Sequence, residues 1–558
     1  MSQRNVVTDV VTRTRNAAES GIFNVHDHRI AGNGHTNDQP ALQALVDELG
    51  AAVAADGRPR SIYCPPGVYL IRDTAVVWRS GVSLIGSGPA VTRFVLDNSG
   101  NPREPVPLAW FTAINHGASR DNHLADCTFA AFEVDGSRVD LPEYNPLAKG
   151  LGLQYVVRGR FDDLYIHDTV GTGFGCDHLQ DAIVHGVTAM RCGRLVRGDQ
   201  MGGAGIGIGV GGWGDIERLT IWGCATIGNG TNGIFVELQE STWSRPRGIR
   251  ITDCHAEGNR FGISDWGANG LVVNACTMIA NHEAGYDLSS MGTTSVAGRG
   301  GLVANCVIDG NIRDGLAIGN TPGPYTFSGN RISGNGRYGY WQHNVGGGHR
   351  GPAGNIVLTD NEIWANALAG IRLDAELDDA TLLNNRIRDN GQRAAPAASG
   401  GGDTVSYTAR TLVDTAADWL ENGHMGKDVT VGEQRAVVVA NSATELVLAP
   451  TRPGAKTSWT ICTPLRGSAY RLPDSPAERP GVCVAAMADH ATKRGNRVWD
   501  SQQRKRQTHG IWVTEHGRCR DSWATDNNFD GNAYGAARFD TAPEGGCWRD
   551  NLGLDGPA

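Results

Sequence analysis

The chain has 558 residues, a formal net charge of −9, and 76 glycines, and 20% of its residues are charged. An acidic chain without an extended Lys/Arg tract is a poor partner for a polyanion, so we expect no nucleic-acid ligand. No run of about 18 apolar residues occurs, which predicts that no segment spans a membrane. The high glycine content indicates many tight turns.

The first residues, Met1 to Asp9, lack the basic and then apolar regions of a secretory signal. We therefore expect an extracellular protein whose signal is not part of this sequence or, alternatively, a virion component that leaves its cell by another route. Twelve cysteines in a chain of this length do not make a disulfide scaffold. Their positions at the ends of predicted strands indicate buried free thiols, and the redox compartment stays open.

Near the N-terminus, the phrase Gly32-Asn33-Gly34-His35-Thr36-Asn37-Asp38 precedes an amphipathic run from Gln39 to Ala55. Two apolar stretches follow, at residues 62–71 and 82–88, and the first contains a Pro-Pro-Gly turn. This order predicts an N-capped helix that covers the open end of a stack of strands. We assign residues 1–60 to the N-terminal segment with this capping helix.

A short phrase, Gly followed by an apolar residue, recurs every 23 to 31 residues, beginning at Gly233-Ile234. Each copy follows a shorter strand that ends in Cys or Asn. Strands this short cannot bury their apolar faces alone, but they can when they stack as coils of a solenoid. Because no helical period of 3.6 residues extends over more than ten residues, the sequence predicts an all-β parallel solenoid over residues 61–393.

The alternation within the phrase predicts which side chains point inward. The residue after each Gly should stack on its counterpart in the next coil, in one buried column formed by Ile234, Ile263, Tyr286, Leu316, Tyr340 and Ile371. Asp265 and Gln342 also fall on inward positions, where a polar group needs a partner. For Asp265 we expect the backbone of a turn, or Arg250 or Arg260.

The composition changes at the Ala/Pro/Gly-rich stretch 394–402. Residues 404–463 contain short hairpin-forming strands without the repeated phrase, which predicts a small inserted β-domain within residues 394–470. Contact with a glycan, contact within a trimer and a passive insertion all stay open as its role. The phrase returns at Gly510-Ile511, so residues 471–558 should form further coils and a C-terminal cap.

The opening phrase, the capping helix, the Pro-Pro-Gly strand and the Gly-rich run 202–210 together resemble the pectate-lyase-like superfamily. That superfamily includes phage tailspikes and glycan-degrading proteins of actinobacteria. The resemblance implies a single-stranded right-handed parallel β-helix, association with carbohydrate and a homotrimer. Since Asn33 and Asn37 replace the acids usual in the opening phrase, we expect no metal at that place. The superfamily contains lyases, hydrolases, transferases and non-catalytic members, so the resemblance leaves the reaction open.

The outward positions of the repeated phrase carry carboxylates, aromatic rings and small residues, whereas an ordinary solvated strand face carries Lys, Glu, Thr and Ser. Aromatic faces suit sugar rings, and carboxylates suit sugar hydroxyls or acid–base chemistry. We therefore expect a polysaccharide-binding groove here, with an ordinary exposed face as the alternative. The predicted substrate-binding residues are Phe235, Trp266, Trp341, His343, Arg372, Asp374 and His178.

Asp177 and Glu237 are the predicted catalytic pair. They should occupy equivalent outward positions two coils apart, at a backbone distance of about 9–10 Å, with Gly207 and Gly209 between them. Such a spacing accommodates inverting or, with side-chain lean, retaining hydrolysis. We expect Glu237 to be the general acid and Asp177 the base, with Asp287 in reserve. The alternative is that these acids brace turns.

No two histidines fall at a metal-ligand spacing, so the sequence predicts neither a metal nor another cofactor. The pairs Asp177-His178 and His167-Asp168 stay open for acid–base or metal chemistry. The most favoured function is an endo-acting glycoside hydrolase that depolymerises a polysaccharide. The alternatives are a polysaccharide lyase, for which Arg372 beside Asp374 is the only suitable groove arrangement, a fructan transferase, and a non-catalytic virion adhesin.

Overall fold

The computed structural model describes residues 21–104, 106–109, 119–141, 145–193, 202–289, 296–319, 321–344, 353–393, 395–449 and 463–554. The chain divides into two compact units, residues 1–229 and residues 230–558. Both are built mainly from parallel strands, and the prediction of an all-β parallel β-helix is confirmed. In the described part of the chain, no helix is long and apolar enough to cross a membrane.

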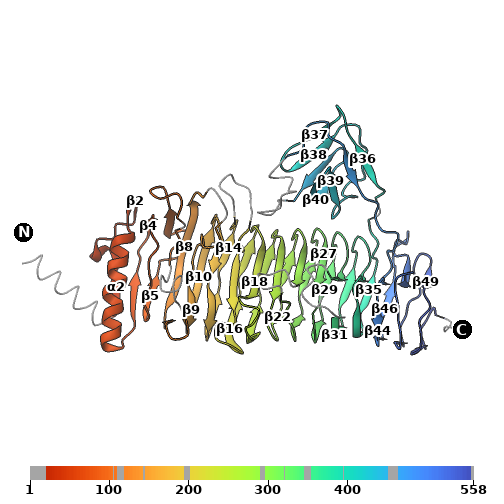
Figure 1. Ribbon diagram of the computed structural model, residues 1–558, viewed down its shortest axis with the longest axis horizontal. Coiled ribbons are helices and arrows are strands. Elements are labelled where there is room, and N and C mark those ends of the chain that lie inside the picture. Colours follow the sequence, from red (N-terminus) through yellow and green to blue (C-terminus); the bar gives the residue numbers. More distant parts are fainter. Residues whose placement is uncertain are drawn as a thin grey trace, which may run out of the picture. The chain divides into compact units, whose positions relative to one another are not determined.

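The first unit opens with the 3-10 helix η1 (Val25–His28), β2 (Asn33–Asn37) and the helix α2 (Gln39–Asp56). Figure 1 shows α2 lying across the end of the first coils, beside β4 and β5. The helix buries one apolar face and ends at Gly57, whose φ of 70° suits a residue without a side chain. Asp38 makes no side-chain cap bond and instead accepts from Ala31 N at 2.7 Å, whereas Asn37 Oδ1 accepts from Gln39 N at 3.2 Å.

The other strands of the first unit pair in parallel with the equivalent strands of neighbouring coils. Phenylalanines fill the interior, and the Phe129 and Phe161 rings stack with centroids 5.6 Å apart. The strands are β1 (Ile22–Asn24), β3 (Arg60–Tyr63), β4 (Gly67–Arg72), β5 (Val82–Ile85), β6 (Thr92–Asp97), β7 (Leu124–Ala125), β8 (Thr128–Arg138), β9 (Gln154–Val157), β10 (Arg160–His167), β11 (Phe174–Gly175), β12 (Asp177–Gln180), β13 (Ala182–His185), β14 (Thr188–Met190), β15 (Ile206–Val210), β16 (Ile216–Trp222) and β17 (Ala225–Ile227).

The second unit contains parallel sheets in which strands from successive coils lie side by side. The first sheet carries the repeated phrase and contains β18 (Asn232–Leu238), β21 (Phe261–Trp266), β24 (Ala284–Leu288), β27 (Asp314–Ile318), β30 (Tyr340–Gln342), β33 (Ile371–Leu373), β43 (Val482–Val484), β47 (His509–Val513) and β49 (Gly535–Phe539). The others contain β19 (Arg247–Thr252), β20 (His255–Glu257), β22 (Val272–Asn274), β23 (Thr277–Ile279), β25 (Leu302–Ala304), β26 (Val307–Asp309), β28 (Tyr325–Ser328), β29 (Arg331–Ser333), β31 (Ala353–Thr359), β32 (Glu362–Trp364), β34 (Leu377–Leu383), β35 (Arg386–Arg388), β44 (Ala488–Asp489), β45 (Thr492–Arg494), β46 (Arg497–Trp499), β48 (Trp523–Thr525) and β50 (Cys547–Arg549).

The predicted buried column is confirmed. Each member pairs with the next in register, from Ile234 with Ile263 through to Tyr340 with Ile371, and all six are fully buried. Asp265 is also buried, and its Oδ1 accepts from Gly267 N and Ala268 N, so the turn backbone is its partner. Every cysteine that the structure describes is a free thiol.

Buried asparagines form ladders along the turns of the second unit. In one ladder, Asn330 N and Nδ2 both donate to Asn361 Oδ1 at 3.0 Å, and Asn361 Nδ2 donates to Phe327 O and to Asn385 Oδ1. A single side chain therefore satisfies backbone and amide groups of three successive coils, which explains the recurring Asn at these strand ends.

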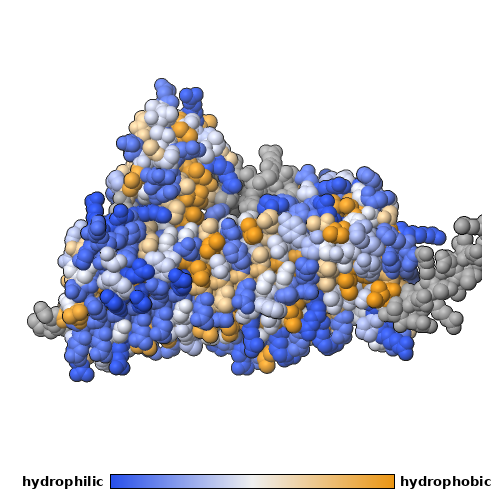
Figure 2. All heavy atoms as spheres, turned by 180° about the vertical axis from the view of Figure 1, so that it is seen from behind, coloured by the Kyte–Doolittle hydropathy of each residue, from blue (hydrophilic) through white to orange (hydrophobic). Residues whose placement is uncertain are grey.

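A separate antiparallel module lies between β35 and β43. Its seven-stranded sheet contains β36 (Ala398–Gly400), β37 (Val405–Tyr407), β38 (Thr411–Asp414), β39 (Asp428–Val431), β40 (Gln434–Asn441), β41 (Glu445–Leu448) and β42 (Tyr470–Leu472). The first and last strands pair, with Ala398 opposite Leu472, so the two ends of the module lie together. The module has its own hydrophobic core, and Figure 1 shows it projecting from the coils. On the face shown in Figure 2, the surface of the module carries hydrophobic residues among hydrophilic ones.

Candidate functional site

Asp177 does not lie on the outward column where the sequence placed it. Strand β11 ends at Gly175, and Asp177 instead begins β12, where it pairs with Gln154 of β9. Its carboxylate binds Lys149 Nζ at 2.9 Å and Gly209 N at 2.8 Å. Burial alone would raise the pKa of Asp177, but the Lys149 ammonium and these hydrogen bonds hold it below its usual value. The side chain is therefore ionised at neutral pH.

A second carboxylate, Glu217 of β16, belongs to the same unit and was missed by the sequence reasoning. Its Oε1 accepts from Gly211 N at 2.9 Å and Trp213 N at 3.0 Å, while Oε2 has no hydrogen-bond partner among the described residues. The side chain is 1% exposed, and burial raises its pKa to about 7 against these two lowering hydrogen bonds. Glu217 therefore keeps its proton to a higher pH than an exposed glutamate does.

The two carboxylates are bound through neighbouring backbone amides. Gly209 of β15 donates to Asp177, and Gly211, which follows the end of β15, donates to Glu217. The two side chains are therefore neighbours within the first unit. The negative charge of Asp177 also helps to raise the pKa of Glu217.

An aromatic wall lies beside these carboxylates. The rings of Tyr155 and His178 have centroids 4.5 Å apart, Tyr155 contacts Trp213 edge to face, and Trp213 Nε1 donates to His178 O at 2.7 Å. Burial lowers the pKa of His178 to about 4, although the Asp177 carboxylate opposes this shift. The imidazole is therefore neutral at pH 7. Tyr155 and Trp213 are half-buried and present partly exposed rings.

The second predicted catalytic carboxylate lies elsewhere. Glu237 belongs to β18 in the second unit, opposite Trp266, and its Oε2 is 3.4 Å from Gln239 Nε2. The predicted pair is thus divided between the two units, because Asp177 belongs to the first. We refer to Asp177, Glu217, Lys149, Tyr155, Trp213 and His178 as the first-unit cluster.

Asp287, the reserve carboxylate, is almost fully buried on the outward face of β24. It accepts from Trp266 Nε1 at 2.7 Å and from Ser289 Oγ at 3.0 Å. Burial raises its pKa to about 6, and these two hydrogen bonds reduce the shift. The ring of Phe235 lies 5.6 Å from that of Trp266. Asp287 therefore holds the Trp266 indole in place rather than facing open solvent.

The other predicted binding residues meet on the same face, over β30 and β33. Trp341 Nε1 and Arg372 Nε both donate to the Asp374 carboxylate, at 2.8 Å and 2.7 Å. The His343 ring lies 4.3 Å from the Trp341 ring, and burial lowers the pKa of His343 to about 4. The Arg337 guanidinium lies 4.3 Å from the centre of the Trp341 ring.

The same arrangement recurs on β47 and β49, where the sequence reasoning did not place a site. Trp512 Nε1 and Arg538 Nε both donate to the Asp540 carboxylate at 2.8 Å. Trp512 follows Gly510-Ile511, where the repeated phrase returns. Its outward position in that phrase is the sequence signal that could have indicated this arrangement. On this sheet, an acid of the following coil thus fixes the orientation of an outward tryptophan.

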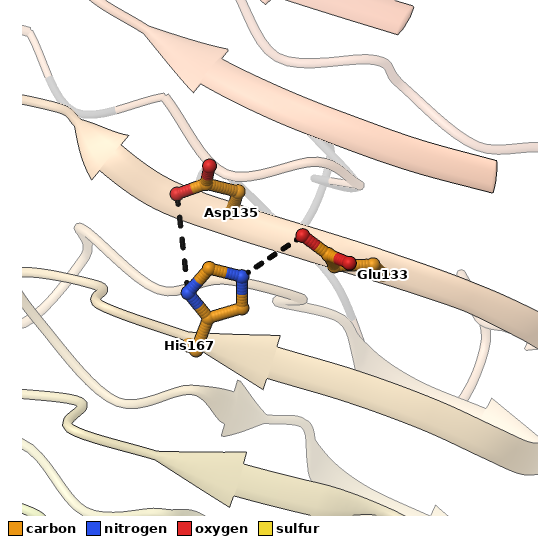
Figure 3. Close-up of side chains that lie close together, drawn as sticks. All are labelled: Glu133, Asp135 and His167. Carbon is orange, nitrogen blue, oxygen red and sulfur yellow. Dashed lines mark hydrogen bonds and ion pairs between the residues drawn. The ribbon is translucent and has the colours of Figure 1, made fainter. Parts of the chain in front are cut away.

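Figure 3 shows the cluster that best resembles a metal site, in which Glu133 and Asp135 of β8 face His167 of β10. His167 Nε2 lies 3.0 Å from Glu133 Oε1, and Nδ1 lies 4.0 Å from Asp135 Oδ1. One His and two carboxylates suit a divalent cation. However, Arg93 already binds both carboxylates, at 2.6 Å and 3.0 Å. The contacts are those of an ion-pair network and do not fit a metal centre.

The sequence reasoning noticed His167-Asp168 but not the two acids that face it. His167 Nδ1 does bind Asp168, at 2.7 Å. Glu133 and Asp135 alternate along one strand, and the coil register places Asp135 opposite His167. That register is not readable in the sequence of these coils, because the repeated phrase begins only later in the chain.

Two family models match the chain. The right-handed β-helix region matches residues 240–348, and the rhamnogalacturonase A/epimerase, pectate lyase-like family matches residues 22–197. The resemblance to right-handed, pectate-lyase-like β-helix proteins is thereby confirmed. Among solved structures, the A-module of mannuronan C-5 epimerase AlgE6 from Azotobacter vinelandii is 13% identical at a TM-score of 0.39, with coverage of 96% of this chain and 100% of that one. ORF18 of Geobacillus virus E2 is 15% identical at a TM-score of 0.44, with coverage of 82% and 84%.

Two curated relatives match shorter stretches. A depolymerase of Klebsiella phage KN3-1, specific for capsule KN3, is 28% identical over 183 residues, which are 31% of this chain and 21% of the depolymerase. Mannuronan C5-epimerase AlgE3 of Azotobacter vinelandii is 36% identical over 80 residues, which are 13% of this chain and 4% of the epimerase. The matches thus span about a fifth or less of the length of these relatives.

Proposed function

We propose that this chain is a carbohydrate-active enzyme that cleaves a polysaccharide by hydrolysis at the first-unit cluster. The observation that carries the proposal is the opposite pKa shift of two nearby carboxylates. Asp177 stays ionised beside Lys149, while Glu217 holds its proton up to about pH 7. Two nearby carboxyl groups, one ionised and the other protonated at the same pH, can act as a general base and a general acid.

In this mechanism Glu217 donates its proton to the glycosidic oxygen as the bond from that oxygen to the anomeric carbon breaks. Asp177 takes a proton from a water molecule, whose oxygen forms the new bond to the same carbon. Inversion of configuration requires room for that water between the two carboxyl groups, which lie about 6.5–9.5 Å apart in inverting enzymes. Lys149 keeps the base charged, and the Tyr155 and Trp213 rings offer faces for a sugar.

A second candidate reaction is proton abstraction, as in a lyase. The neutral His178 imidazole beside Tyr155 and the cationic Lys149 favours it, because a neutral base can remove a proton while a cation stabilises the carbanion that forms. Such a reaction requires an acidic sugar and forms an unsaturated product. The glycan transferase and adhesin alternatives have no specific observation in their favour.

The relatives support a polysaccharide as substrate, since one is named for a capsule and the other for mannuronan. A phage depolymerase among them also agrees with a virion-associated or extracellular protein. The homotrimer implied by the superfamily stays a prediction. A light-scattering mass near the 59.3 kDa of one chain would contradict it.

Product analysis over a panel of capsular and cell-wall glycans tests the proposed reaction. We expect a fall in polymer size together with new reducing ends and no new ultraviolet absorbance. Products that absorb in the ultraviolet would instead identify the lyase reaction. Binding without any change in polymer size, over the whole panel, would contradict an enzymatic role and favour an adhesin.

Trp341 tests whether the outward face of the second unit takes part in glycan binding. We expect Trp341→Ala to weaken glycan binding about 2- to 12-fold, as the loss of one stacking ring of about 0.5–1.5 kcal/mol would, with kcat almost unchanged. Isothermal titration gives the affinity, and Trp523→Ala is the control because that ring is 45% exposed on another sheet. Equal affinities for both variants would remove this face from the binding site.

A further inference from the structure

A cavity of about 230 Å³ lies between the antiparallel module and the coils of the second unit. On the coil side it is lined by Arg337, Tyr338, Leu368 and Arg393, and the module contributes Met425 and Lys427. None of these module residues takes part in the sites described above. We propose that this cavity binds an acidic sugar, with the Arg393 guanidinium holding the sugar carboxylate.

Arg393 is the unmatched charge of the cavity. Its Nη1 is buried and has no hydrogen-bond partner, and no carboxylate in the described part of the chain forms an ion pair with it. Burial lowers the pKa of Arg393. Arg393 as a whole is only partly buried and lines the cavity, so its guanidinium is available to an anion from outside the chain.

The other charges around the cavity are mostly matched within the protein. Arg337 forms an ion pair with Asp314, and Asp428 forms one with Arg313. Lys427 is different, because its Nζ donates only to carbonyl oxygens among the described residues, including those of residues 395 and 473, each at 2.7 Å. Burial lowers the pKa of Lys427 to about 8, partly offset by Asp474. Asp474 also lines the cavity, so the two cations without an ion pair, Arg393 and Lys427, exceed this carboxylate by one positive charge.

The rest of the lining indicates what kind of anion fits. Tyr338 and Leu368 are largely buried side chains of one hydrophobic cluster, and Met425 and two prolines add further apolar surface. A bare inorganic anion would leave this surface unused, whereas a sugar ring would cover it. The planar guanidinium of Arg393 matches a carboxylate with two parallel hydrogen bonds. A cavity of this volume accommodates a single sugar residue, so the expected ligand is one uronate unit.

Melting of the full-length protein with and without ligand tests the proposal, independently of any glycan cleavage. We expect millimolar D-glucuronate or D-galacturonate to raise the melting temperature of the wild type, and D-glucose to leave it unchanged. Arg393→Met should abolish this response, because it removes the guanidinium that binds the carboxylate. Arg435→Gln, which changes an exposed arginine of the same module, should behave as the wild type.

Several outcomes would overturn the assignment. One is a uronate response that persists in Arg393→Met, since the anion would then bind elsewhere. Another is an equal response to sulfate, which would identify a general anion site instead of a sugar site. If Arg393→Met does not fold, Arg393→Lys keeps the charge but loses the paired donors. It should weaken uronate binding severalfold by isothermal titration, and an unchanged affinity would contradict the proposal.

Discussion

Replacing Asp177 by Asn or Glu217 by Gln should each lower kcat on a cleavable glycan by about 10²–10⁴-fold, since each side chain transfers one proton. The amides have nearly the same shape, so the coils should remain folded and glycan affinity should persist. Initial rates of reducing-end formation measure the effect, with circular dichroism as the check on folding. Glu237→Gln is the informative comparison, because it removes the acid that the sequence alone paired with Asp177.

The pH profile gives a second readout of the same pair. Glu217 acts in its protonated form, and its raised pKa of about 7 means that the acid is progressively lost as the pH rises through 7. Asp177 acts ionised and remains so well into the acidic range, because its pKa is lowered. We therefore expect kcat to be highest below pH 7 and to fall above it. An inactive Glu237→Gln beside a normally active Glu217→Gln would contradict this assignment.

Asn361→Ala should produce the largest loss of stability among changes at turns. The substitution leaves Asn330 N and Phe327 O without this partner, and Asn330 Nδ2 keeps only its bond to Val303 O. Each buried polar group left unsatisfied costs about 1–3 kcal/mol, so the loss of two such partners should lower the free energy of unfolding by about 2–6 kcal/mol. Urea denaturation followed by circular dichroism measures this loss.

Asn101→Ala is the matched control for the ladder. Asn101 is exposed, and among the described contacts only its backbone makes hydrogen bonds, so its substitution should change stability by less than about 0.5 kcal/mol. Similar midpoints for the two variants would show that the ladder does not hold the coils together. Loss of the second unit alone would show instead that the two units unfold separately.

The fold of the second unit was readable because its information is local and repeated. Because the Gly-apolar phrase recurs along the sequence, each coil places the residue after the Gly inward. The column from Ile234 to Ile371 shows this arrangement. Asp265 and Gln342 fell on inward positions by the same alternation, and both are fully buried. Register, burial and the column of asparagines thus follow from the period of the sequence.

The candidate site was not readable in the same way. Lys149, Asp177 and Glu217 are far apart in the sequence and meet only because their coils stack, and no spacing indicates that contact. Asp177 lies outside the outward column because β11 ends at Gly175. Its carboxylate instead binds the Lys149 ammonium and the Gly209 amide. The pKa values of Asp177 and Glu217, like the unmatched charge of Arg393, arise from burial and neighbours. The sequence by itself thus determined the repeating backbone, whereas only the tertiary structure decided which charges lie side by side, because electrostatic shifts depend on distances between coils.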